Sequence, residues 1–407
     1  MFDIVFKHIK TIFSAFVVTS IINVSASVYF ARILGPEVFY VFIASQLFRE
    51  IVGIPFAASF NLPLYHFRKR IAYVSTRLSA LILVSFFLYL SLMLILLNSG
   101  KSFIPNIDKN VVMALSIVFA LNAFGSLSTT ILQARDEYKL VSNINIVATM
   151  FSTLASLVII AFFQSVYVLV VKEIVYKALL WMGCSYRVGS LAFILPNFKI
   201  KKKVMKVLLF QSYRIWTINF LDIVSTRLDK YLVNIFYIPV VLSNLQQARY
   251  YAELPSTLIM PLTPLFYEKL SDPIYSLESK KNLVRQISIV LIALGLCCGI
   301  GLYMLGPAAI LFLLGEDWAL AAEFSRGLSF YIALLPYANF IKIVAYYRKQ
   351  NRSVAFAQIV QICAFVISFY WVHLYYTMQM LPVVFFISTL AYVFTLLFIL
   401  RVSKNHA

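Results

Sequence analysis

Lys199-Ile200-Lys201-Lys202-Lys203 and the apolar stretch that follows, Val207 to Tyr237, decide how this chain is organised. The basic run closes at Lys206 and lies halfway along the chain. The apolar stretch is about 30 residues long, or roughly 45 Å as a helix, which is enough to span a bilayer. Because equal numbers of such stretches lie on each side of the basic run, we interpret the run as a linker between two halves.

Polar side chains follow one face of this predicted helix. At about 100° per residue they fall within an arc of roughly 80°. They are Gln211, Arg214, Asp222, Ser225 and Asp229. Ionisable groups inside a membrane are costly and usually face a bundle interior or a water-filled cavity. We therefore expect this face to line a cavity rather than to contact lipid.

The composition excludes a soluble globular protein. The chain has 407 residues, of which 62% are hydrophobic and only 13% are charged, as is typical of a polytopic membrane protein. Its apolar stretches predict twelve transmembrane helices, at residues 11–33, 38–61, 78–98, 111–133, 141–163, 166–188, 207–236, 240–267, 284–306, 318–346, 353–375 and 380–401. The expected fold is all-α, with two six-helix bundles around a central cavity. The expected domains are residues 1–198, a cytoplasmic basic linker at 199–206, and residues 207–407.

The net charge of +19 indicates membrane topology rather than nucleic-acid binding. With the N-terminus inside, most lysines and arginines lie in cytoplasmic segments, and the external loops hold only Lys101 and Lys109. The external loops instead carry acidic residues: Glu37, Asp108, Glu316 and Asp317. Both termini are therefore expected in the cytoplasm, and no nucleic acid is expected as a partner.

The second and eighth predicted helices share a polar spacing. The same three residue types recur at a constant offset: Gln46, Arg49 and Pro55, then Gln246, Arg249 and Pro255. Both helices run in the same direction, as a parallel internal repeat requires. We expect Arg49 and Arg249 to approach the cavity from the two halves at similar depth. With Arg214 and Lys172, they give it a positive charge that attracts an anion.

Acidic residues lie near these arginines in the sequence. Glu50 directly follows Arg49, and neighbouring residues on a helix point in different directions, so we expect each to have a separate partner. Glu253 lies four residues after Arg249, within reach along the same helix. The alternative to anion binding is that Arg249 pairs with Glu253, and Arg49 with an acid elsewhere, to hold the helices together.

Other predicted helices carry fewer signals. Glu173 and Lys177 are four residues apart and predict an ion pair along the sixth helix. Lys172 is then left without an acidic partner on that helix. The eleventh and twelfth helices hold only His373 as an interior ionisable residue, and we expect them to be peripheral. The sequence has no histidine or cysteine cluster with metal-ligand spacing and no glycine-rich phosphate loop. Neither a metal nor another cofactor is expected.

Several short motifs resemble a known family. They are Arg32 with Leu34-Gly35-Pro36-Glu37, Arg227-Leu228-Asp229-Lys230, Tyr250-Tyr251, Pro261-Leu262-Thr263-Pro264, and Leu305-Gly306-Pro307. Their order along the chain is similar to that in Wzx-type polysaccharide flippases of the MOP (multidrug/oligosaccharidyl-lipid/polysaccharide) exporter superfamily. The resemblance implies a transporter rather than an enzyme. It would move an undecaprenyl-pyrophosphate-linked oligosaccharide, such as an O-antigen unit, to the outer leaflet of a bacterial cytoplasmic membrane by alternating access.

The resemblance also implies partners, while the polar and charged residues inside the predicted spans give the candidate site. The partners are the lipid-linked substrate, membrane lipids, a polysaccharide polymerase and chain-length proteins. Arg49, Arg249, Arg214 and Lys172 are the candidate substrate-binding residues. The residues expected to line the cavity or to couple transport are Gln46, Glu50, Gln211, Asp222, Asp229, Gln246 and Glu253.

Two other functions stay open from the sequence. A cation-coupled drug exporter of the same superfamily needs unpaired carboxylates, and Asp222, Asp229 and Glu253 could supply them. A polytopic O-antigen polymerase or glycosyltransferase generally has a large external loop for its sugar chemistry. The longest external connection in this chain, residues 98–110, is too short to form a domain, which disfavours the enzyme.

Overall fold

The computed structural model describes residues 2–53, 56, 71–99, 104, 107–135, 137–188, 220–221, 223–257, 277–348 and 350–402. Within these residues the regular structure is entirely helical, so the predicted all-α fold is confirmed. The chain divides into two compact units, Met1–Phe220 and Leu221–Ala407. The predicted linker at 199–206 lies outside the described residues, as do Gln211, Arg214 and Asp222.

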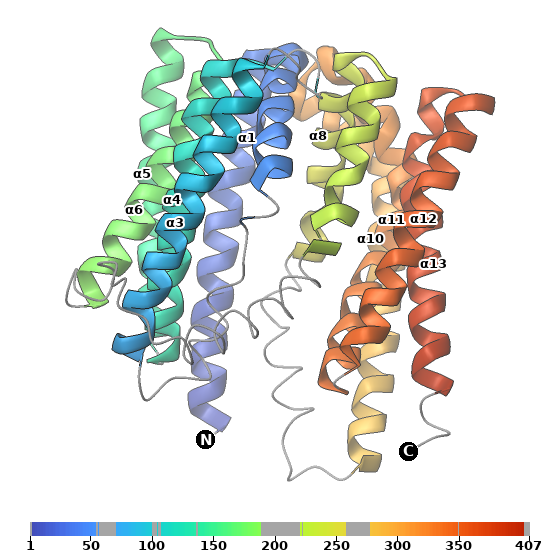
Figure 1. Cartoon of the computed structure of the whole chain (residues 1–407). Helices are drawn as coiled ribbons and strands as arrows, with labels where there is room; N and C mark the ends of the chain where they lie inside the picture. Colours follow the sequence, from blue (N-terminus) through green and yellow to red (C-terminus); the bar gives the residue numbers. More distant parts are fainter. Residues whose placement is uncertain are drawn as a thin grey trace. The chain divides into compact units, whose positions relative to one another are not determined.

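The N-terminal unit is built from long helices that pack side by side (Figure 1). Its described helices are α1 (Phe2–Gly53), α3 (Ile71–Asn98), α4 (Lys109–Ala134), α5 (Tyr138–Phe162) and α6 (Tyr167–Val188). Leu78, Leu127, Ile131 and Cys184, all fully buried, form an apolar core between α3, α4 and α6. Polar contacts add to this packing: the Tyr176 hydroxyl donates to Asn145 Oδ1 at 2.7 Å, which joins α6 to α5.

The C-terminal unit repeats this all-helical construction. Its described helices are residues 223–236, α8 (Pro239–Thr257), α10 (Leu277–Leu314), α11 (Ala319–Tyr347), α12 (Asn351–Tyr375) and α13 (Leu381–Val402), with short 3₁₀ turns at Glu316–Trp318 and Met378–Met380. The Asn244 carboxamide of α8 accepts a hydrogen bond from the Ala321 N–H at 2.9 Å. It thereby satisfies one of the backbone donors that the first turn of α11 leaves without an intrahelical partner.

Helix α1 combines two of the predicted membrane spans. Its 52 residues would extend about 78 Å as one straight helix, more than twice the thickness of a bilayer core. Gly35 interrupts it with φ 70° and ψ 171°, values outside the helical region, and Pro36 begins the next segment. Figure 1 shows the chain turning back at this break. The Gly-Pro turn that the sequence predicts is confirmed.

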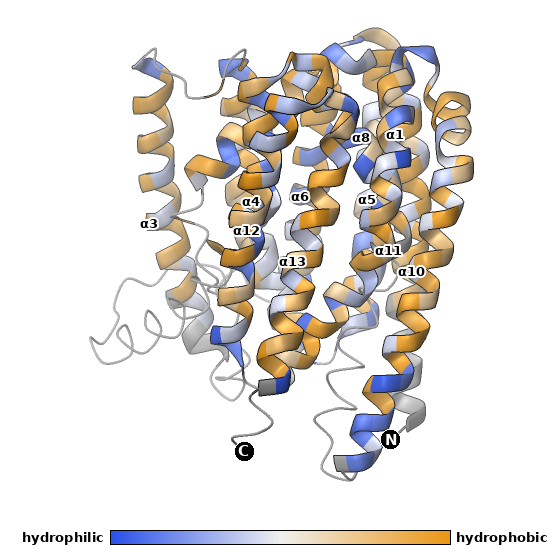
Figure 2. Cartoon of the chain, turned by 90° about the vertical axis from the view of Figure 1, so that its right-hand side faces the viewer, coloured by the Kyte–Doolittle hydropathy of each residue, from blue (hydrophilic) through white to orange (hydrophobic). Residues whose placement is uncertain are grey.

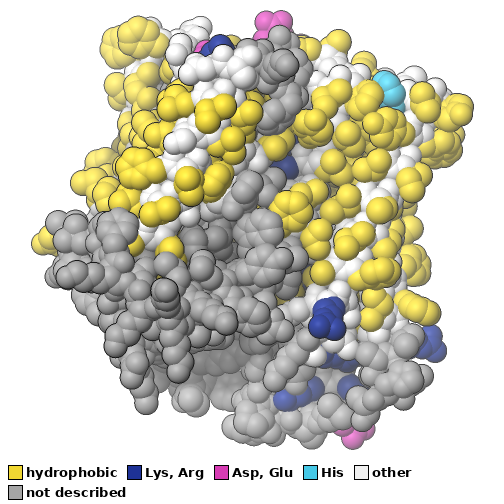
Figure 3. All heavy atoms as spheres, in the orientation of Figure 1, with side chains coloured by type: hydrophobic (Ala, Val, Ile, Leu, Met, Phe, Trp, Pro, Cys, Tyr) yellow, Lys and Arg dark blue, Asp and Glu magenta, His cyan; other side chains and the backbone are white. Residues whose placement is uncertain are grey.

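The outward faces of the described helices suit a lipid environment. Among the described residues, eight helical segments are long and apolar enough to cross a membrane, and one of them contains the break at Gly35. Helices α6 and α8 are shorter or more polar, yet they occupy two more of the predicted spans. Hydrophobic residues dominate most helices in Figure 2, and their side chains cover much of the helical surface visible in Figure 3. The predicted polytopic membrane fold is confirmed, and the prediction of twelve spans is consistent with it.

Helices α10 and α11 approach each other closely at two glycines. A Cβ atom added at Gly299 would lie 2.7 Å from the Ser329 carbonyl oxygen, and one added at Gly295 would overlap the Ala333 carbonyl oxygen. Small residues commonly allow membrane helices to pack at such short range.

We expect Gly295→Ala to lower the melting temperature of the purified protein. The added methyl group must push α10 away from α11, and overpacking of this kind costs about 1–3 kcal/mol. Gly301→Ala is the matched control, because a Cβ atom at Gly301 on the same helix meets nothing within 4 Å. Equal melting temperatures for the two variants would contradict the close packing of α10 and α11.

Candidate functional site

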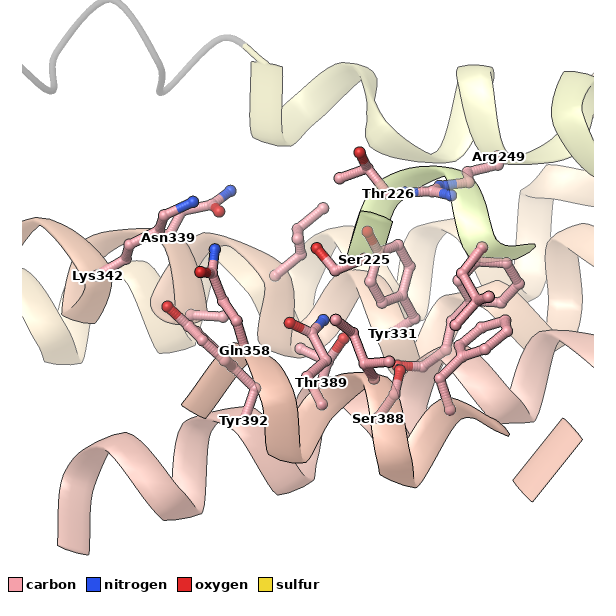
Figure 4. Close-up of a pocket in the computed structure, with 17 residues that line it drawn as sticks. Ser225, Thr226, Arg249, Tyr331, Asn339, Lys342, Gln358, Ser388, Thr389 and Tyr392 are labelled. Atoms are coloured by element: carbon pink, nitrogen blue, oxygen red, sulfur yellow. The ribbon is translucent and has the colours of Figure 1, made fainter. Parts of the chain in front are cut away.

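A polar cavity lies inside the C-terminal unit, within its membrane-spanning part. Its volume is about 130 Å³, and it is lined from residues 223–236 and from helices α8, α11, α12 and α13 (Figure 4). The polar residues of its wall are Ser225, Thr226, Arg249, Tyr331, Asn339, Lys342, Gln358, Gln361, Ser388, Thr389 and Tyr392. Such a concentration of polar groups between apolar helices marks a candidate functional site.

Helical spacing brings these polar side chains to one cavity. Asn339 and Lys342 are three apart on α11, Gln358 and Gln361 are three apart on α12, and Ser388 lies four before Tyr392 on α13. Residues at these spacings share one face of a helix. The sequence-based expectation that the last two helices are peripheral is therefore wrong for one face of each. The spacing of uncharged polar residues along these two helices indicates their inward faces, whereas the expectation rested on ionisable residues alone.

Arg249 of α8 lies at the wall of this cavity and contacts two carboxylates. Its Nη1 atom is 2.7 Å from Asp229 Oδ2, and its Nε atom is 2.5 Å from Glu253 Oε1. The guanidinium also lies over the Phe385 ring, 5.0 Å from the centroid. The Tyr331 hydroxyl completes the network by donating to Glu253 Oε1 at 2.8 Å. These contacts hold Arg249 in place between its own helix, α11, α13 and residues 223–236.

Asp229 is the most deeply buried member of this network. Its side chain is 1% exposed, against 16% for Arg249 and 26% for Glu253. Gln246 donates to Asp229 Oδ2 at 3.2 Å, while Oδ1 has no hydrogen-bond partner in the described part of the chain. Two carboxylates thus face one guanidinium. The structure therefore brings Asp229, Gln246, Arg249 and Glu253 together in one network, in which only Arg249 also lines the cavity.

The N-terminal unit has a comparable cluster around Arg49 of α1, whose side chain is 11% exposed. Its Nη1 atom lies 3.8 Å from Glu173 Oε2 of α6 and 3.5 Å from the Leu115 carbonyl oxygen of α4. Its Nη2 atom lies 3.4 Å from Glu50 Oε1, and Gln46 donates to the same oxygen at 3.0 Å. Arg49 therefore links three helices of this unit.

The contact between Arg49 and Glu50 corrects a sequence-based expectation. Neighbouring side chains leave a helix in different directions, but the long arginine side chain bends back far enough to reach the carboxylate. Arg49 also has the expected partner elsewhere, Glu173. Lys177 lies over the ring of its neighbour Tyr176 on α6, 5.1 Å from the centroid, while Glu173 contacts Arg49 of α1. Lys172 lies over the Phe30 ring, 5.5 Å from its centroid.

The two arginine clusters contain both ion pairs that we expect if the arginines hold the helices together instead of binding an anion. Arg249 pairs with Glu253 along its helix, and Arg49 pairs with an acid on another helix. They differ in tightness, because the nitrogen–oxygen distances are 2.5 and 2.7 Å around Arg249 but 3.4 and 3.8 Å around Arg49. Ion-paired hydrogen bonds usually measure about 2.7–2.9 Å. The acids therefore hold Arg49 more loosely than Arg249.

Comparison with known proteins finds one protein family whose model matches most of the chain. The model of a family described as polysaccharide biosynthesis proteins matches residues 30–323. The sequence matches none of the curated proteins with which it was compared.

The fold is similar to those of several solved transporters. The lipid II flippase MurJ in an inward closed conformation has a TM-score of 0.66 and 16% identity, over 95% of this chain and 87% of that one. An inward-facing MATE family multidrug resistance transporter of the MOP superfamily has a TM-score of 0.67 and 12% identity, over 95% of both chains. A MOP superfamily transporter from Pyrococcus furiosus has a TM-score of 0.61 and 13% identity, over 98% of this chain and 96% of that one. At these identities the similarity establishes the fold.

Proposed function

Since the chain belongs to the polysaccharide biosynthesis protein family, we propose that it flips an undecaprenyl-pyrophosphate-linked oligosaccharide from the cytoplasmic to the periplasmic leaflet. Membership in this family and a MOP-type transporter fold agree with the resemblance read from the sequence. The observation that carries the proposal is the polar cavity with Arg249 at its wall, inside a membrane-spanning unit. Such a cavity gives a charged, hydroxyl-rich headgroup an environment that lipid does not.

Exchange of ionic partners explains how the arginines act in transport. Without substrate, Asp229 and Glu253 neutralise Arg249, and Glu50 and Glu173 neutralise Arg49. A pyrophosphate offers several oxygens to the guanidinium fork and competes with these carboxylates. The looser contacts of Arg49 make it the first to exchange. Lys172, beside Phe30 in the same unit, adds positive charge for the same anion.

The remaining proposals concern where the protein acts. It lies in the bacterial cytoplasmic membrane, with both termini in the cytoplasm, because the lysines and arginines are concentrated on that side in the twelve-span topology. A polysaccharide polymerase and chain-length proteins take over the flipped unit. The seventh-span residues Gln211, Arg214 and Asp222 belong to the same path in this proposal.

One observation favours a second candidate function, a cation-coupled drug exporter. The C-terminal cluster has two carboxylates for one arginine, and Asp229 Oδ1 has no hydrogen-bond partner among the described residues. An organic cation would gain from such a site. The two functions differ in the charge of the cargo, which an experiment can measure.

Deletion of the gene in its own bacterium tests the proposed function. We expect loss of the surface polysaccharide and accumulation of the lipid-linked unit on the cytoplasmic face, because the polymerase no longer receives its substrate. The wild-type gene on a plasmid should restore both, which serves as the control. Unchanged polysaccharide together with increased sensitivity to cationic drugs would instead favour the drug exporter.

A further inference from the structure

We infer that the cavity of the C-terminal unit binds one pyranose residue of the transported glycan. This inference rests on the proposed function and assigns the sugar part of the cargo to particular side chains. The cavity volume is about 130 Å³. Since each water takes about 30 Å³ in the liquid, the cavity holds roughly four waters, or no more than a single sugar ring in their place.

Three side chains of the wall present open hydrogen-bonding groups. Asn339 of α11, Gln361 of α12 and Thr389 of α13 line the cavity, and within the described ranges their side chains make no hydrogen bond to the rest of the chain. Each amide offers one acceptor and two donor hydrogens, and the hydroxyl both donates and accepts. Sugar hydroxyls likewise donate and accept, so this set matches a pyranose rim better than it matches an organic cation.

The rest of the wall fits the other surfaces of a sugar. Leu335, Ile362 and Phe365 line the same cavity and provide apolar contacts for the C–H groups of a ring. Ligand pockets generally combine an apolar lining with a few placed polar groups in this way.

The two ends of the cavity differ in their charge. Arg249 is already bound to Asp229 and Glu253 by short contacts. Figure 4 shows Asn339 at one end of the cavity and Arg249 toward the other, so the amide end suits the sugar and the arginine end suits the phosphate.

The test compares two lipids that differ only in the sugar. The probes are the undecaprenyl-pyrophosphate-linked glycans extracted from the source bacterium and sugar-free undecaprenyl pyrophosphate. Each is titrated by microscale thermophoresis against the full-length protein in lipid nanodiscs. We expect Thr389→Val and Gln361→Leu each to weaken binding of the glycosylated lipid roughly fivefold, as the loss of one neutral hydrogen bond implies. Affinity for the sugar-free lipid should stay unchanged, which also shows that the variants are folded.

Thr395→Val is the matched control. Thr395 lies on the same helix, α13, but it is not among the residues that line the cavity, and its hydroxyl donates to the Ala391 carbonyl oxygen of its own helix at 2.8 Å. We expect this variant to bind both lipids as the wild type does. Equal weakening for both lipids, or no weakening for either, overturns the sugar site while leaving the proposed function standing. If the wild type binds neither lipid, the proposed function fails, and the sugar site fails with it.

Discussion

Replacing Arg49 by lysine is expected to lower the rate of flipping about tenfold or more, while the protein still accumulates normally in the membrane. Lysine keeps the positive charge near Glu50 and Glu173 but loses the planar fork that binds two phosphate oxygens at once. A hydrogen bond to a charged group contributes about 1.5–3 kcal/mol, and about 1.4 kcal/mol corresponds to tenfold. The contacts of Arg49 with its acids measure 3.4 and 3.8 Å, so folding depends little on their detailed geometry.

Arg187→Lys is the control for this experiment. Arg187 lies on α6 of the same unit and is exposed, so its exchange should change neither flipping nor accumulation. Flipping is measured from the transbilayer movement of the lipid-linked glycan, and accumulation from the amount of protein in isolated membranes. Normal flipping by Arg49→Lys would show that Arg49 only packs the helices of its unit.

Arg249→Ala is expected to destabilise the protein strongly. The substitution leaves Asp229, which is 1% exposed, and Glu253 without the guanidinium that compensates both carboxylates. Removing one partner of a buried ion pair typically costs about 3–5 kcal/mol. We therefore expect a much lower melting temperature and little protein in the membrane. Arg249→Lys retains the charge, and we expect it to accumulate but to flip at least about tenfold more slowly, because one ammonium group cannot reproduce the fork.

A second substitution separates charge from packing in this network. Adding Asp229→Asn to Arg249→Ala removes one uncompensated carboxylate, so part of the lost stability should return. Arg326→Ala is the control, because Arg326 is exposed on α11 of the same unit. If Arg249→Ala melts at the temperature of the wild type, the network does not stabilise the C-terminal unit.

The lengths of the apolar stretches and the turn residues between them predicted most of the helices. The predicted spans at 318–346, 353–375 and 380–401 correspond closely to α11, α12 and α13. Helix α10 differs more, because it runs from Leu277 to Leu314 through Pro307, well beyond the predicted 284–306. A proline inside a membrane helix is tolerated when neighbouring groups satisfy the freed backbone, and a sequence pattern does not reveal those neighbours.

The site was predictable only in its charged residues. Costly ionisable groups such as Arg49, Asp229 and Arg249 stand out in apolar segments, and the spacing of Arg249 and Glu253 predicted their pair correctly. The contact of Glu173 with Arg49 depends on how α1 and α6 pack, which helical spacing cannot provide. Asn339, Gln361 and Thr389 carry no charge and lie on three helices, so only the fold identifies them as one cavity wall.

Transbilayer movement in proteoliposomes tests the central claim most directly. The purified protein is reconstituted with a fluorescent undecaprenyl-pyrophosphate-linked glycan, and a membrane-impermeant quencher reports the fraction in the outer leaflet over time. We predict that the wild type moves the glycan lipid well above the rate in protein-free liposomes, and that the variant carrying both Arg49→Lys and Arg249→Lys does not. Movement no faster than in protein-free liposomes, alongside transport of a cationic dye, would contradict the proposed flippase.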